Sequence, residues 1–93
     1  MIGILTIHLH LPACTSLKEK RGRIRPLLAR LRRQFNVSVA EMDLQDQWQE
    51  ALISCAMVGN ESGHLQSALQ NVQKWVQGNW PDGMVVEDRI ELV

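Results

Sequence analysis

The chain has 93 residues, of which 45% are hydrophobic and 22% charged, and its formal net charge at pH 7 is zero. This length predicts one domain over residues 1–93, with a core large enough to fold without disulfides or metal. The ordinary composition excludes a disordered chain, and no apolar run approaches the ~20 residues of a membrane span. No charged segment precedes the first apolar stretch, so we expect no signal peptide and a cytoplasmic location.

The chain begins with an alternating apolar pattern over residues 2–11, which is typical of a β-strand with one buried face. A short connection over residues 12–15 follows. Ser16, with Glu19 three positions later, then matches the capping box that begins a helix. From position 17 onward, apolar residues recur at helical spacing and predict a helix over residues 17–35. Its apolar seam consists of Leu17, Ile24, Leu28, Leu31 and Phe35.

Pro26 lies inside this predicted helix, where a proline removes one backbone hydrogen bond and presses on the carbonyl group of Gly22. One interpretation is a single helix that is kinked at this point. The alternative is a shorter helix that starts at Pro26 and follows a basic loop over residues 17–25. We favour the single, kinked helix.

The rest of the chain predicts three further strands and a second helix. β-Branched and apolar runs indicate strands over residues 37–42 and 48–58, joined by a polar turn. Asn60 or Ser62 is a candidate cap for the second helix, and Gly78 is its candidate C-terminal stop. The apolar seam of this helix consists of Leu65, Leu69, Val72 and Val76. A final strand over residues 84–93 is expected to turn four apolar residues to one side: Met84, Val86, Ile90 and Leu92.

The predicted order of elements is therefore βαββαβ. Strand–helix–strand connections of this length are right-handed, and a tight hairpin joins the two halves. These rules lead to an α+β, ferredoxin-like sandwich with a four-stranded antiparallel sheet in the order 4-1-3-2 and both helices on one face. The other face of the sheet is then open and half apolar, which makes it a candidate surface for a homodimer.

Charge is distributed unevenly along the chain. Residues 1–40 contain eight basic residues and the single acid Glu19, whereas residues 41–93 contain nine acids and only two bases, Lys74 and Arg89. On a helical wheel, basic residues cover the solvent side of the first helix. Such a surface is suited to the phosphates of structured RNA. The candidate RNA-binding residues are Lys18, Lys20, Arg21, Arg23, Arg25, Arg30, Arg32 and Arg33.

A solvated helix face, partly paired with Glu41, Asp43 and Asp46, would also explain this run of charge. The alternative function is a homodimeric protein-interaction module, in which the open sheet face self-associates and the basic helix contacts an acidic protein partner. Sequence-specific RNA readout is not implied, because the chain has no tyrosine and places its one phenylalanine, Phe35, in the helix seam.

Other patterns do not amount to a catalytic or metal site. His8 and His10 share a strand face, but no second pair of ligands follows at a defined spacing. Trp48 is expected to anchor the hairpin that carries the three acids. Cys14 and Cys55 are expected to be free thiols, and no base can be assigned beside Cys14. The loop over residues 12–15 lacks the glycines and arginine of the acylphosphatases, so we predict no enzymatic activity and no cofactor.

Three motifs, SLKEKR at residues 16–21, FNVSVAE at 35–41 and DLQDQW at 43–48, together resemble the YlxP-like family of small bacterial proteins. The resemblance spans nearly the whole chain. It implies a ferredoxin-like fold and a bacterial cytoplasmic protein suspected of ribosome association, and it supplies no catalytic residues. We therefore expect a non-enzymatic accessory factor that binds structured RNA or the ribosome and acts in ribosome maturation or translation.

Overall fold

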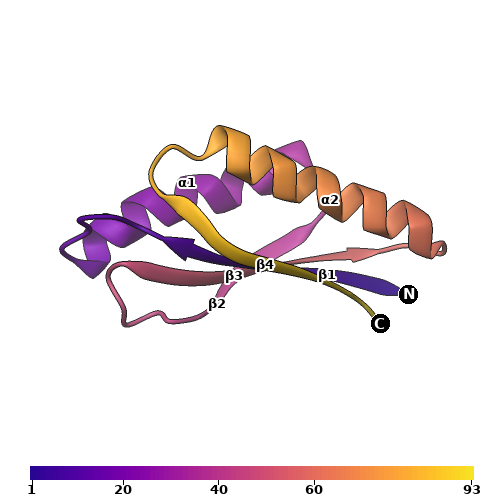
Figure 1. The fold of residues 1–93 in the computed structure, drawn as a ribbon, viewed down its shortest axis with the longest axis horizontal. Coiled ribbons are helices and arrows are strands. Elements are labelled where there is room, and N and C mark those ends of the chain that lie inside the picture. The colour runs from indigo at the N-terminus through magenta and orange to yellow at the C-terminus, as the bar shows by residue number, and fades with distance from the viewer.

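The computed structural model describes residues 1–93, and its elements follow the predicted order βαββαβ (Figure 1). They are β1 (Ile2–His10), α1 (Leu17–Gln34), β2 (Ser38–Asp43), β3 (Glu50–Val58), α2 (Ser62–Asn79) and β4 (Met84–Leu92). The strands form one antiparallel sheet in the order β2-β3-β1-β4, which is the predicted order read from the opposite edge. Both helices cover the same face of the sheet, so the ferredoxin-like sandwich is confirmed. Neither helix combines the length and apolarity that crossing a membrane requires.

The core lies between the sheet and the two helices. Alternate residues of β1, namely Leu5, Ile7 and Leu9, are fully buried because the pleat turns every second side chain toward the helices. Leu31 of α1 and Leu69 of α2 meet them in the same apolar cluster. The opposite face of the sheet carries no helix and remains open.

Helix α1 is one continuous helix from Leu17 to Gln34 and passes through Pro26 without a break. The backbone N–H of Glu19 donates a hydrogen bond of 3.0 Å to the Ser16 hydroxyl, as the capping prediction requires. The Glu19 carboxylate accepts a hydrogen bond of 2.9 Å from the backbone N–H of Thr15, which lowers the pKa of this carboxyl. The alternative of a basic loop followed by a shorter helix is therefore wrong.

Helix α2 differs from the prediction at both ends. Its N-cap residue is Glu61, whose side chain makes no capping hydrogen bond, so neither Asn60 nor Ser62 is the cap. At the other end the helix passes through Gly78 and stops only at Trp80. The Trp80 side chain is buried, and its backbone N–H donates to the carbonyl oxygen of Val76. The last helical residue is therefore Asn79, one position beyond the expected glycine, and the buried Trp80 is the C-cap.

Strand β4 contains a bulge that the alternating pattern does not predict. The pairing with β1 shifts between His8 and Leu9, so Val85 pairs with Leu9 and packs against the core. Val86 is the extra residue and is 54% exposed. Met84 pairs with His10 on the open face, whereas Ile90 pairs with the buried Leu5. The expectation that Met84 and Val86 share a face with Ile90 and Leu92 is therefore wrong, because an inserted residue reverses the alternation on one side of a bulge.

Candidate nucleic-acid interface

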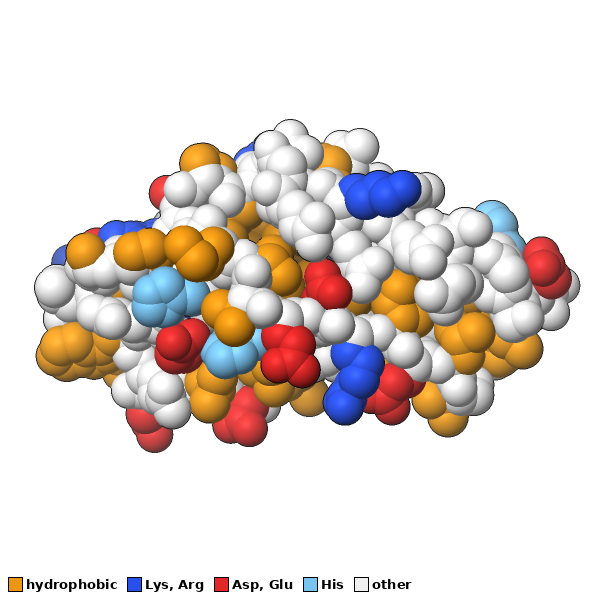
Figure 2. All heavy atoms as spheres, viewed as in Figure 1, with side chains coloured by type: hydrophobic (Ala, Val, Ile, Leu, Met, Phe, Trp, Pro, Cys, Tyr) orange, Lys and Arg blue, Asp and Glu red, His pale blue; other side chains and the backbone are white.

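Basic and acidic residues are separated between the two layers of the sandwich. The helices contain nine of the ten basic residues, with Glu19 as their one acid. The strands and the β2–β3 loop contain seven acids, with Arg89 as their one base, and the other two acids, Glu61 and Asp82, lie in the loops at the two ends of α2. Figure 2 shows acidic side chains gathered over the strands, below the helices. The fold therefore preserves the charge asymmetry of the sequence, because both helices lie on the same face of the sheet.

Four basic side chains of α1 are exposed and form no ion pair or hydrogen bond within the chain. They are Lys18, Arg21, Arg25 and Arg33. The first three surround a shallow hollow on the helix surface that Gly22 and Pro26 leave open. Positions three and four apart are neighbours on a helix, so Lys18, Arg21 and Arg25 form a continuous positive surface that is free to meet a ligand. Arg33 adds a fourth free cation about two turns further along the helix.

Arg30 and Arg32 are also exposed, but the chain holds each of them in place. The Arg30 guanidinium lies 4.8 Å from the centre of the Trp75 ring and donates a hydrogen bond of 3.2 Å to the carbonyl oxygen of Asn79. Arg32 donates one of 2.8 Å to the carbonyl oxygen of Val39. Neither has a carboxylate partner, so both keep their full charge and some of their five N–H donors for a ligand.

Arg23 connects α1 to the loops on either side of it. Its Nη2 lies 2.7 Å from Oε1 of Glu19, and its Nη1 donates hydrogen bonds to the carbonyl oxygens of Pro12 and Asp82 at 3.1 and 3.2 Å. Its backbone carbonyl also accepts the indole N–H of Trp80 at 3.4 Å. Most of its donors are used within the chain, so Arg23 is a structural residue at the rim of the positive surface.

Lys20 is not part of the surface. Its side chain points into the protein and the residue is only 2% exposed. Its Nζ lies 2.9 Å from Oε2 of Glu41 and donates a hydrogen bond of 2.7 Å to the carbonyl oxygen of Leu44. The Glu41 oxygen is buried and has no regular hydrogen bond, so the contact is mainly an ion pair. The prediction that Lys20 contacts RNA is corrected, because its position on the wheel lies beside the apolar seam.

The acids around the β2–β3 hairpin do not form a joint site. Glu41 is occupied by Lys20, and Asp43 accepts a hydrogen bond of 2.8 Å from the backbone N–H of the next residue. Asp46 lies exposed in the loop. Trp48 was expected to anchor this hairpin, but it lies outside β3 and is 51% exposed. The anchoring is done by Lys20, which holds the loop by the carbonyl group of Leu44.

A second polar cluster lies on the open face of the sheet. His8 Nε2 and His10 Nδ1 lie 2.8 and 3.1 Å from the two carboxylate oxygens of Glu50 on β3. Burial raises the pKa of Glu50, but the hydrogen bonds from His10 and His8 together lower it more, so the net pKa lies below its ordinary value of 4.5. The structure contains no group of three or more His, Cys, Asp or Glu side chains placed to hold a metal ion. The sequence reasoning missed Glu50, because its role depends on the β1–β3 register.

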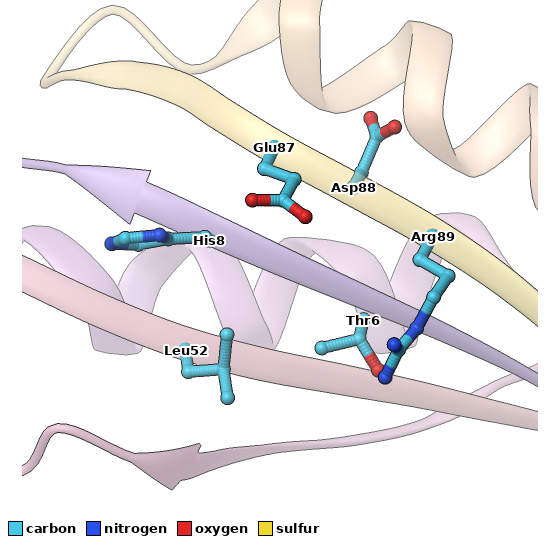
Figure 3. A pocket seen from close by; sticks show the side chains of 6 residues that line it. All are labelled: Thr6, His8, Leu52, Glu87, Asp88 and Arg89. Carbon is cyan, nitrogen blue, oxygen red and sulfur yellow. The ribbon is translucent and has the colours of Figure 1, made fainter.

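Next to this cluster lies a hollow on the open face, which Figure 3 shows from close by. His8 and Arg89 stand at its two ends, with Glu87 between them, while Asp88 points to the opposite side of β4. Asp88 accepts a hydrogen bond of 3.4 Å from Gln77 of α2. The lining of the hollow contains both signs of charge and one apolar side chain, Leu52. This mixture does not point to one class of ligand.

Neither cysteine has the environment of a nucleophile. Both thiols are free and buried. Burial raises the pKa of Cys55 to about 11, so the thiol stays protonated at neutral pH. The Cys14 thiol faces the carbonyl oxygen of Ser16 at 3.5 Å, which is an acceptor and not a base that could activate it.

The Glu50 cluster leads to a testable effect of pH on stability. A carboxyl group whose pKa is lowered by folding stabilises the protein above its unfolded pKa and loses this contribution as the pH falls through its folded pKa. Wild type is therefore expected to be more stable than Glu50→Gln at neutral pH, with a difference that shrinks as the pH falls below 4.5. Urea unfolding of both proteins between about pH 3 and pH 7 measures this difference. A difference that stays constant over the whole range would contradict the prediction.

The fold and the surface together define a small α+β sandwich with a cationic helix layer and an acidic sheet layer. The chain belongs to the family described as "Protein of unknown function (DUF503)", whose model matches residues 2–89. It is similar to the "Uncharacterized protein YlxP" of Bacillus subtilis (strain 168), with 33% identity over 76 residues, or 82% of this chain and 83% of that relative. The predicted membership of a YlxP-like family is confirmed.

Proposed function

We propose that this protein is a non-enzymatic accessory factor of the cytoplasm that binds structured RNA, as in the ribosome or its precursors, through the exposed cations of α1. The observation that carries the proposal is the lack of acidic partners for six of the eight basic residues of this helix. Only Lys20 and Arg23 are paired with carboxylates of the chain. A helix face whose charges are solvated for solubility alone would carry both signs of charge.

The unpaired cations impose a cost on the free protein. Lys18, Arg21 and Arg25 are three and four positions apart, and like charges at these spacings destabilise a helix by about 0.2–0.5 kcal/mol per pair. A bound phosphate backbone would remove this repulsion and would release counterions from the RNA. The acidic sheet layer would repel RNA, which supports the helix layer as the contact surface.

Co-sedimentation with ribosomes and with purified ribosomal RNA tests this proposal. The Arg21→Gln/Arg25→Gln variant removes two of the free cations from the exposed surface of α1. Its matched control, Lys74→Gln/Arg89→Gln, removes the same net charge from α2 and β4. We expect the first variant to lose at least about tenfold in affinity, because two phosphate contacts disappear, and the control to bind like wild type. Equal losses in both variants, or in neither, would contradict a specific role for α1.

A homodimeric interaction module is the second candidate, and exposed apolar side chains on the sheet layer favour it. Ile2, Met84 and Val86 are each exposed by more than 40%. Two copies that pair through this face would bring their acidic residues together, so salt would strengthen the dimer, whereas salt weakens binding to RNA. Sedimentation equilibrium at two salt concentrations separates the candidates. Competition between RNA and an acidic polypeptide then tests whether α1 prefers an acidic protein.

A further inference from the structure

We infer that the RNA segment bound by α1 is an A-form double helix and not a single strand. The inference rests on the proposed function, since it specifies the kind of RNA that the same surface takes. Three features of the helix layer support it: the absence of a stacking surface, the smooth crest of α1 and the extent of its cations.

The helix layer offers no aromatic surface on which unpaired bases could stack. Phe35 and Trp75 pack against each other edge to face, with ring centres 6.0 Å apart, and Arg30 covers the Trp75 ring. Trp80 is buried in the core. The one well-exposed aromatic side chain, Trp48, lies in the β2–β3 loop. Proteins that bind single strands gain much of their affinity from stacked bases, so this surface lacks the main feature that single-strand binding requires.

The crest of α1, which points away from the core, is lined by small side chains. Gly22, Pro26 and Ala29 are exposed there, and a Cβ atom added to Gly22 would meet nothing within 4 Å. Lys18 and Arg25 lie to one side of this crest and Arg33 continues it toward the C-terminus. Gly22, Pro26 and Ala29 have no side chain long enough to reach base edges, so this part of the surface can approach a nucleic acid closely and contact phosphates without reading sequence.

The dimensions of the cationic surface fit the shallow groove of A-form RNA. From Lys18 to Arg33 the helix rises about 22 Å, and a helix with side chains is about 10–12 Å wide. The minor groove of B-DNA is only about 6 Å wide, too narrow for this helix. The major groove is about 12 Å wide and would admit α1, but proteins bind there through side chains that reach base edges, which Gly22, Pro26 and Ala29 lack. The A-form minor groove is wide and shallow and carries 2′-hydroxyl groups. Arg30 and Arg32 keep free N–H donors on the exposed surface of α1, and these can bond to the hydroxyls.

Fluorescence anisotropy with four labelled probes tests the inference. The probes are an RNA duplex of about 16 base pairs, a second duplex of unrelated sequence, an unstructured single strand of the same length, and the DNA duplex that corresponds to the first probe. We expect the two RNA duplexes to bind with similar affinity, and each to bind about tenfold more tightly than the single strand or the DNA. A single strand or a DNA duplex that binds as tightly as the RNA duplex overturns the inference.

Two variants separate this inference from the proposed function on which it rests. Gly22→Gln places a longer side chain on the crest, where space is open and glutamine is the better helix former, so the fold is retained. The Gly22→Gln variant is expected to bind the duplex severalfold more weakly with no loss of thermal stability. An unchanged duplex affinity would show that the crest of α1 does not approach the duplex closely. Arg21→Gln/Arg25→Gln tests the function itself. If wild type binds all four probes equally and this variant binds none of them, the RNA-binding function is supported and the duplex preference is overturned. If no probe binds wild type, both fall.

Discussion

Raising the salt concentration from about 50 to about 200 mM is expected to weaken the binding of this protein to structured RNA by about 100-fold. Lys18, Arg21, Arg25 and Arg33, the four cations that no contact within the chain holds in place, are expected to make the phosphate contacts. Each such contact lowers the logarithm of the binding constant by about 0.7–0.9 for every tenfold increase in salt. Four contacts over this range of salt give the expected loss. Equilibrium binding of a labelled RNA at several salt concentrations measures the slope.

Variants make this prediction specific to α1. Arg21→Gln/Arg25→Gln should reduce the slope by about two contacts, whereas Lys74→Gln/Arg89→Gln should leave it unchanged. Arg23→Gln offers a further contrast, because this residue is held by Glu19 and two carbonyl groups. The Arg23→Gln variant is expected to lower thermal stability and to change the salt slope little. A slope that is the same for wild type and the Arg21/Arg25 variant would show that α1 does not contact phosphate.

Lys20→Met is expected to reduce the free energy of unfolding by about 3 kcal/mol. The substitution keeps the length and apolar stem of the side chain but removes the ammonium group. It leaves the carboxylate of Glu41 and the carbonyl group of Leu44 without their donor. Breaking a buried pair from one side costs about 3–5 kcal/mol, and the partial exposure of Glu41 places this pair at the lower end. Denaturant unfolding followed by circular dichroism measures the loss.

A double variant tests whether the loss comes from the unpaired carboxylate. Lys20→Met/Glu41→Met removes both charges, and we expect it to recover about half of the lost stability, since apolar replacement of a buried ion pair is often close to neutral. RNA binding by the Lys20→Met variant, measured where it is still folded, is expected to equal that of wild type. If the Lys20→Met variant keeps its stability and loses RNA affinity, Lys20 belongs to the binding surface after all.

The fold follows from the sequence because its patterns agree with one another. The alternation in β1, the capping pair Ser16 and Glu19, and the apolar seam of α1 all lead to the same sandwich. The ends of elements were harder to predict, since they depend on distant contacts. Gly78 has the chemistry of a helix stop, but the buried Trp80 extends α2 beyond it.

The surface was predicted only in part, because a helical wheel assigns each residue an angle but not a partner. Lys20 lies beside the apolar seam, where a lysine is tolerated only if a carboxylate meets it, and that carboxylate comes from β2. Arg23 has an outward angle, yet the loops that reach over it supply carbonyl groups. The link between Glu50 and the two histidines likewise depends on strand register. No spacing along the sequence contains this information.

The separation of charge between helix layer and sheet layer affects how the molecule meets a polyanion. With no net charge, the protein gains little attraction from its charge as a whole. The opposite charges of its two layers nevertheless give it an electric dipole. The field of a nearby RNA would therefore rotate the molecule until α1 faces the RNA. This torque acts only within a Debye length, about 8–10 Å at physiological ionic strength, so an RNA that binds the protein would orient it just before contact.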